Sequence, residues 1–151
     1  MRLISKFKNL NTYIYLLVLL VKFDMELSRN GFNNTFKRYA YKHLNIRDIK
    51  WDKESIEKTK SEIERIFHIL DVVCVWYPRK ADCIHKTLLG YKIIRKNFAI
   101  PVEMVIGIKK FPFEAHAWLQ CNGDNFFDDQ EETSRYNIIL DSRELKKEDL
   151  K

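Results

Sequence analysis

The sequence contains few residues that break regular structure: four glycines and three prolines among 151 residues. Because glycine and proline mark turns and linkers, this scarcity argues against a loop-rich or disordered chain. Cysteine is also scarce. Cys74, Cys83 and Cys121 are odd in number and irregularly spaced, so they do not indicate a disulfide framework. We therefore expect one ordered domain in a reducing compartment, the cytoplasm.

Long apolar runs are absent as well. The longest, residues 13–21, has nine apolar residues, whereas a membrane-spanning helix needs ~20. We expect this run to lie in a core-packing helix, with interfacial membrane contact and a targeting signal as the lesser alternatives. The net charge is +6, but Lys and Arg are scattered and form no basic stripe, so we expect no nucleic acid as a partner.

The first half of the chain has helical patterns. Residues 3–27 and 33–43 carry apolar side chains at helical spacing, and residues 28–31 between them favour a turn. The broad face expected to be buried on the first helix consists of Leu3, Ile4, Phe7, Leu10, Ile14, Leu17, Val18 and Val21. A third helix is expected to begin at Asp52, an N-cap flanked by Trp51 and Ile56 as a hydrophobic staple. Its buried stripe is expected to be Ile56, Ile63, Ile66, Phe67, Leu70 and Val73, and Pro78 marks a break.

The second half begins with a helix and continues as strands. The helix is expected over residues 82–96 with Asn97 as its C-cap, and its two apolar sides predict a central position. Residues 102–109 and 114–121 alternate in polarity, as strands do. Asn122 and Gly123 favour a hairpin turn into a return strand over residues 124–129. Residues 136–140 fit one more strand or a short helix.

Three of these elements carry residues of a nucleophilic site. Cys83 lies in the first turn of the predicted helix, where free N–H groups and the helix dipole favour the thiolate that attacks an amide. His116 lies on a predicted strand between Ala115 and Ala117, where it could accept and return a proton. Asp128 on the predicted return strand could fix the tautomer of that imidazole.

Each residue also has a structural alternative. A cysteine at a helix start is often a small core residue, a lone strand histidine is often structural, and Asp128 could be a solvated loop residue. A zinc site from Cys83, His85, His116 and Cys121 is disfavoured because the sequence has no paired CxxC ligands. Trp76 and Trp118 are candidate subsite residues, with core packing as the favoured interpretation of both. We expect no metal and no cofactor.

The second half contains the motifs Trp76-Tyr77-Pro78, Asp82-Cys83-Ile84, Leu88-Leu89-Gly90, Val105 to Ile108, Pro112 to Trp118, Gly123 and Phe127-Asp128. In these motifs it resembles the leader peptidases of lasso-peptide biosynthesis, which belong to the transglutaminase-like, papain-related superfamily. The resemblance implies Cys83 as nucleophile, His116 as base and acid, and Asp128, in preference to Asp129, as orienter. It predicts an α+β fold in which a helical N-terminal half, residues 1–73, packs on a transglutaminase-like catalytic core, residues 74–151. This core has a central helix and an antiparallel sheet.

The resemblance also implies partners. Such enzymes cut the leader from a ribosomally made precursor peptide, and an asparagine-synthetase-like cyclase then closes the ring on the freed amine. Residues before Cys74 show helices without the strands of a winged-helix domain, so we expect the leader-binding winged-helix protein to be separate. One departure from the family pattern is Asp82, because a carboxylate beside Cys83 disfavours the thiolate unless it points away.

Two other classes of function fit the same residues. A transglutaminase or other acyltransferase would pass the acyl group of the same thioester to an amine instead of water. A non-catalytic module would only bind a leader, or dock on a membrane through residues 3–27. The mass of the product separates the two enzymes, and the substitution Cys83→Ala separates both from the binding module.

Overall fold

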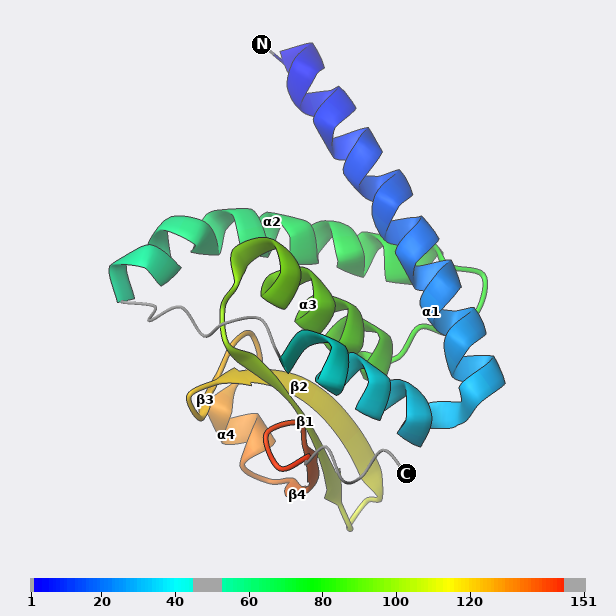
Figure 1. Cartoon of the computed structure of the whole chain (residues 1–151), viewed down its shortest axis with the longest axis vertical. Coiled ribbons are helices and arrows are strands. Elements are labelled where there is room, and N and C mark those ends of the chain that lie inside the picture. The colour runs from blue at the N-terminus through cyan, green and yellow to red at the C-terminus, as the bar shows by residue number, and fades with distance from the viewer. Residues whose placement is uncertain (1, 45–52, 146–151) are drawn as a thin grey trace.

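The computed structural model of the chain describes residues 2–44 and 53–145 (Figure 1), with the backbone alone for residues 2–9, 43, 44, 53, 55, 56 and 58. The elements are α1 (Arg2–Leu44), α2 (Lys53–Trp76), α3 (Cys83–Phe98), β1 (Val102–Lys109), β2 (Glu114–Cys121), β3 (Asp124–Asn125), α4 (Gln130–Thr133) and β4 (Asn137–Asp141). The predicted α+β class, a helical N-terminal part with an antiparallel sheet, is confirmed. Trp51 and Asp52, expected to begin α2, lie outside the described residues, as does the side chain of Ile56.

Helix α1 consists of two segments joined at Gly31, whose φ of 73° and ψ of 168° interrupt the helix. The turn expected over residues 28–31 therefore lies at Gly31 alone. The Thr35 hydroxyl donates a hydrogen bond of 2.8 Å to the Gly31 carbonyl and supports the start of the second segment. Figure 1 shows the first segment projecting beyond the rest of the molecule and the second turning back along it.

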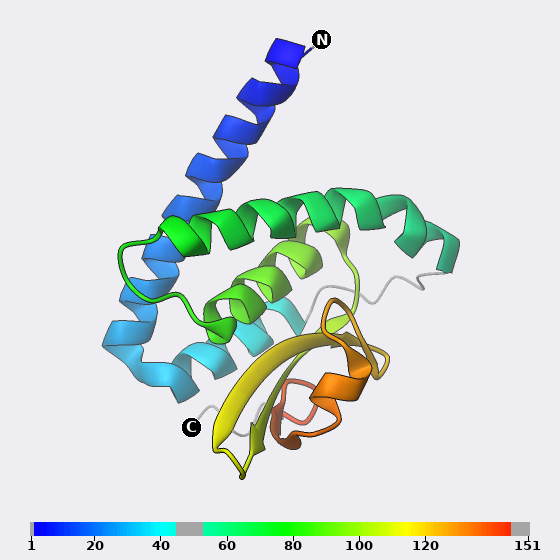
Figure 2. The same ribbon diagram turned by 180° about the vertical axis from the view of Figure 1, so that it is seen from behind.

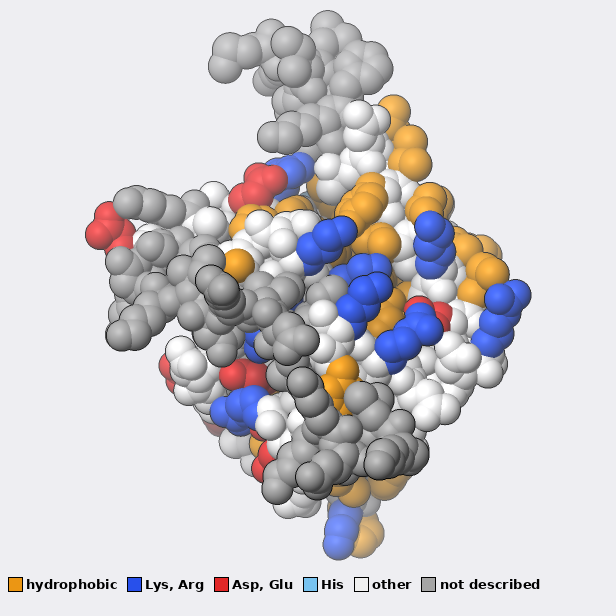
Figure 3. Space-filling view, in the orientation of Figure 1, with side chains coloured by type: hydrophobic (Ala, Val, Ile, Leu, Met, Phe, Trp, Pro, Cys, Tyr) orange, Lys and Arg blue, Asp and Glu red, His pale blue; other side chains and the backbone are white. Residues whose placement is uncertain are grey.

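The first segment of α1 buries a different face from the one expected. Leu16, Leu20 and Phe23 are buried. The expected residues Leu10, Ile14, Leu17, Val18 and Val21 are exposed instead, and Figure 3 shows apolar side chains along the outer side of this helix. Residues 13–21 are apolar on every side of the helix, so the sequence pattern alone could not select the face that meets the neighbouring helices. None of the helices within the described residues has a stretch long and apolar enough to cross a lipid bilayer.

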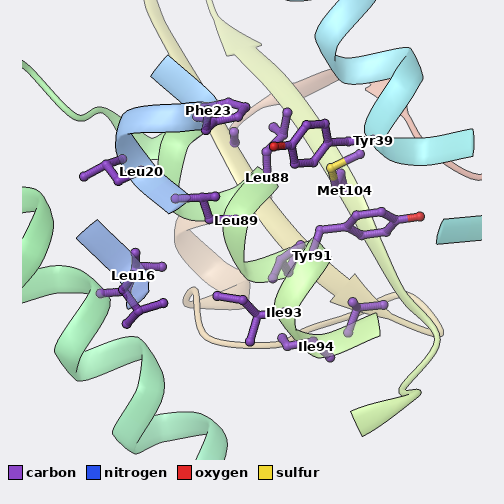
Figure 4. Packing of buried hydrophobic residues seen from close by; sticks show 14 of the residues in the cluster. Leu16, Leu20, Phe23, Tyr39, Leu88, Leu89, Tyr91, Ile93, Ile94 and Met104 are labelled. Carbon is purple, nitrogen blue, oxygen red and sulfur yellow. The ribbon is translucent and has the colours of Figure 1, made fainter. Parts of the chain in front are cut away.

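Helix α3 occupies the centre, between the other helices and the sheet (Figures 1 and 2). Its buried residues include Leu88, Leu89, Tyr91, Ile93 and Ile94, and Figure 4 shows them beside Leu16, Leu20 and Phe23 of α1 and Met104 of β1. The expected central position is thus confirmed. Asn97 is not its C-cap: the helix continues to Phe98, and Ala99 takes the left-handed conformation with φ of 55°. Helix α2 continues through Trp76 and stops just before Pro78, as the proline predicts.

The sheet is antiparallel, with the order β3-β2-β1-β4. The hairpin turn falls on Asn122 and Gly123, with φ of 56° and 92°, as expected. The expected return strand over residues 124–129 is wrong beyond Asn125. There the chain leaves the sheet, because Phe127 packs on Phe67 of α2 and Asp129 caps α4 by accepting a hydrogen bond of 2.7 Å from the Glu131 N–H. Residues 137–141 form a strand, β4, at the edge beside β1.

Candidate active site

Cys83 is the first residue of α3, and its side chain is half-buried. The residue before it, Asp82, is extended with φ of −87° and ψ of 179°, and its backbone N–H donates a hydrogen bond of 3.1 Å to Nδ1 of His85. The Asp82 carboxylate forms an ion pair of 3.3 Å with Lys80 in solvent. The sulfur therefore lies at the positive end of a helix dipole, and the neighbouring carboxylate has its own cation.

His116 is the third residue of β2, and its Nε2 is 2.7 Å from Oδ1 of Asp128. Asp128 follows β3 on the loop that leads to α4, so the carboxylate approaches the imidazole from outside the sheet. Phe127 anchors this loop on α2, because the centroid of its ring lies 4.1 Å from the centroid of the Phe67 ring. On the other side, the His116 ring stacks on Trp118 with centroids 5.8 Å apart and planes at 15°. These contacts fix the plane of the imidazole.

The thiol of Cys83 meets the same imidazole. A hydrogen bond with His116 lowers the pKa of Cys83, and backbone N–H groups of Ala117 and Ile84 lower that pKa further, against the opposite effect of burial. The hydrogen bond to Asp128, followed by the one to Cys83, raises the pKa of His116 from 6.5 to about 10. Both shifts favour a thiolate beside an imidazolium. Because Asp128 engages Nε2, Nδ1 is the ring nitrogen left for the sulfur.

A cavity of about 380 Å³ opens beside these three side chains. Phe67, Leu119 and Phe127 form apolar walls, and Thr87 lies one helical turn after the cysteine. Lys86 and Asp71 also line it and form an ion pair of 2.6 Å with each other. The cavity thus offers an apolar site directly next to the sulfur, with charged groups on one side.

The structure places neither candidate subsite tryptophan in this cavity. Trp118 is buried and stacks on the His116 ring, outside the cavity lining. Trp76, at the end of α2, is 83% exposed and lines a separate apolar groove with side chains of α1. Within residues 2–44 and 53–145, no group of three His, Cys, Asp or Glu side chains is arranged to hold a metal ion.

Sequence reasoning missed a buried group close to Cys83. Asp24 of α1 is 6% exposed and contacts Tyr77, Arg79 and His85, which flank the start of α3. A weak signal was available in the sequence: Asp24 comes four residues after Leu20, so helical spacing places it on the same side of the helix as that apolar residue. Its partners could not have been identified, because the nearest in sequence, Tyr77, is 53 residues away.

A thiol at a helix start, an imidazole on the neighbouring strand and a carboxylate behind the imidazole define the class of papain-like and transglutaminase-like proteins. The family comparison agrees with this class. A family model described as "Transglutaminase-like superfamily" matches residues 34–141, and the chain belongs to that superfamily. No curated protein and no solved structure matches the chain significantly. The transglutaminase-like domain is compatible with a cysteine peptidase or with an acyltransferase.

Proposed function

We propose that this protein is a cysteine peptidase that cleaves the leader from a ribosomally made lasso-peptide precursor. The observation that carries the proposal is the contact of His116 with Cys83 on one side and with Asp128, at 2.7 Å, on the other. Membership of the transglutaminase-like superfamily supports the reaction class. The block Pro112-Phe113-Glu114-Ala115-His116-Ala117-Trp118, which resembles that of lasso leader peptidases, supports the substrate class.

In the first half of the reaction, the Cys83 sulfur attacks the carbonyl carbon of the scissile peptide bond, and a C–S bond forms. The His116 imidazolium gives its proton to the leaving nitrogen, so the C–N bond breaks and the amine of the core peptide departs. In the second half, a water oxygen attacks the thioester and His116 takes its proton. The C–S bond breaks, the leader leaves with a new carboxyl terminus, and the thiolate is restored.

Asp128 would hold the His116 ring in the tautomer that presents Nδ1 to the sulfur, and it stabilises the imidazolium. The backbone N–H of Cys83 is the first candidate donor to the oxyanion, because the first N–H groups of a helix have no intrahelical partner. The cavity walls formed by Phe67, Leu119 and Phe127 suit an apolar side chain of the substrate next to the cleaved bond.

The proposal includes three partners: the precursor peptide through its leader, a separate winged-helix leader-binding protein, and an asparagine-synthetase-like cyclase that consumes the freed amine. The described residues before Cys74 form helices α1 and α2, so that stretch is not itself a winged-helix fold, and the leader-binding protein is proposed as a partner. We place the reaction in the cytoplasm, where the cysteines Cys74, Cys83 and Cys121 stay reduced.

The test is to incubate the protein with a lasso precursor peptide and its leader-binding protein, and to measure product masses with and without an added primary amine. Hydrolysis adds the mass of one water to the leader fragment even when the amine is present. Transfer of the leader to the amine would instead identify an acyltransferase and overturn the peptidase assignment.

The matched variants are Cys83→Ala and Cys121→Ala, since both cysteines are half-buried and only Cys83 contacts His116. We expect Cys83→Ala to abolish cleavage and Cys121→Ala to retain it. If maturation of the precursor continued at the wild-type rate with Cys83→Ala, the protein would act only as a binding module.

A further inference from the structure

Asp24 lies in the first segment of α1, and its carboxylate is buried between that helix and the connection from α2 to α3. Its Oδ2 accepts a hydrogen bond of 2.8 Å from the Tyr77 hydroxyl and lies 2.8 Å from a guanidinium nitrogen of Arg79. Figure 2 shows this connection running from the end of α2, past α1, to the first turn of α3. One carboxylate thus holds two residues of the segment that leads to Cys83.

The same carboxylate faces the helix that carries the nucleophile. Its Oδ1 is 3.7 Å from Nε2 of His85, a distance too long for a hydrogen bond. The other nitrogen of His85 accepts the Asp82 N–H at 3.1 Å. Asp24 therefore faces His85, and the bond between His85 and the Asp82 backbone closes the start of α3 directly before Cys83.

A buried carboxylate strongly favours the arrangement in which its partners stay in place. Removing one partner of a buried charge pair is costly because the other charge is left without compensation. Burial, followed by the hydrogen bond to Asp24, raises the pKa of Tyr77, so this phenol stays protonated and keeps donating. The segment from Tyr77 to Asp82 is consequently fixed at both ends, by α1 and by α3.

We infer that Asp24 is a positioning residue for the nucleophile: through Tyr77, Arg79 and His85 it fixes the start of α3 and thereby the place of the Cys83 sulfur beside His116. The inference rests on the proposed function for its catalytic meaning. The position of the sulfur can nevertheless be measured without any substrate, because only a thiolate held against the imidazole reacts readily with an alkylating agent near neutral pH.

The test measures the rate of Cys83 alkylation by iodoacetamide as a function of pH, with peptide mass mapping to separate Cys83 from the other thiols. In Asp24→Asn we expect the midpoint of this profile to move up toward ~8.5, the value of an ordinary thiol. The matched control is Glu26→Gln, which removes another carboxylate of α1 whose ion-pair partner, Arg38, lies in the same helix. Its midpoint should equal that of the wild type.

Two milder variants serve if Asp24→Asn does not fold. Tyr77→Phe removes the hydroxyl that donates to Asp24, and Arg79→Gln removes the guanidinium, whose side chain is 62% exposed. The pH midpoint of Cys83 alkylation is then measured in these two variants. Each should move the midpoint in the same direction by a smaller amount. An unchanged midpoint in folded Asp24→Asn, or in both of these variants where Asp24→Asn is unfolded, would overturn the inference.

With the precursor peptide as substrate, we expect folded Asp24→Asn to lower kcat about tenfold or more while KM changes little, because displacement of a reacting group affects the chemical step. A rise in KM at constant kcat would contradict a positioning role. If no peptide is cleaved even by the wild type, the proposed function fails, while the alkylation profiles still decide whether Asp24 positions the sulfur.

Discussion

The hydroxyl of Thr87 donates a hydrogen bond of 2.9 Å to the carbonyl oxygen of Ala117, and both residues are buried. Thr87 lies one helical turn after Cys83, and Ala117 directly follows His116. This bond therefore ties the helix of the thiol to the strand of the imidazole and contributes to holding the two groups together.

Replacing Thr87 with valine keeps the shape of the side chain and removes the donor. We expect a loss of about 1–3 kcal/mol in the free energy of unfolding, measured by urea denaturation, because a buried carbonyl loses a partner. The cleavage rate should also fall. The matched control is Thr35→Val, since Thr35 is a buried threonine that donates to the Gly31 carbonyl away from the cavity. Equal losses of cleavage in the two variants would refute the link between Thr87 and the site.

The order of the causes that raise the pKa of His116 gives a second prediction. The hydrogen bond to Asp128 comes first and the one to Cys83 second, so Asp128→Asn should lower the pKa of His116 more than Cys83→Ala does. The measurement is the pH dependence of the imidazole resonances of His116 in NMR spectra. A larger decrease in Cys83→Ala than in Asp128→Asn would contradict this order.

The raised pKa of His116 also predicts how stability depends on pH. The pKa is about 10 in the folded protein and ordinarily 6.5, so the folded state binds the proton more tightly than the unfolded state does. The contribution of His116 to stability is fully present below pH 6.5, decreases as the pH rises, and is lost above about 10. The difference in unfolding free energy between the wild type and His116→Asn should follow this course. A difference in unfolding free energy that increases with pH would contradict this prediction.

The three thiols should differ in reactivity. Burial raises the pKa of Cys74 and that of Cys121, whereas the hydrogen bond with His116 lowers the pKa of Cys83. In the wild-type protein near neutral pH, iodoacetamide should therefore label Cys83 first. This preference should decrease in His116→Ala, and peptide mass mapping after brief labelling measures both. Faster labelling of Cys121 would contradict the assignment of the thiolate.

Gly107 on β1 is paired with His116 on β2 and leaves room for the aromatic rings beside the imidazole. A Cβ atom at Gly107 would lie 2.8 Å from Cβ of Tyr136 and 2.9 Å from the Trp118 ring. We expect Gly107→Ala to cost about 1–3 kcal/mol by overpacking and to lower the cleavage rate by displacing the His116 ring. Gly123→Asn is the control, because no atom lies within 4 Å of its added Cβ and asparagine tolerates the positive φ of this turn. A thermal melt and a cleavage assay on both variants test this.

Local patterns were sufficient for the elements that bear the thiol and the imidazole. The apolar stripe of α2 with Ile63, Leu70 and Val73 is buried as its period predicts, and α3 begins at Cys83. The alternation over residues 114–121 also predicts the strand that carries His116. These features depend on periodicity and on turn residues, which act over a few positions of the chain.

The long-range arrangement could not be predicted in the same way. Asp128 was expected on a strand and lies on a loop, because Phe127 finds its partner, Phe67, sixty residues earlier in the chain. The edge position of β4 and the contacts of Asp24 likewise depend on segments that meet only in the folded protein. The predicted buried face of α1 was wrong for the same reason, since the run 13–21 is apolar all round and does not reveal which side its neighbours cover.

The most direct test of a shared catalytic unit compares cleavage of the precursor peptide by Cys83→Ala, His116→Ala and the double variant. If the thiol and the imidazole act together in one step, each single change should lower kcat/KM by several orders of magnitude, and the double variant should fall no further than Cys83→Ala. Losses that multiply in the double variant, or cleavage that persists without the sulfur, would contradict a thioester mechanism at Cys83.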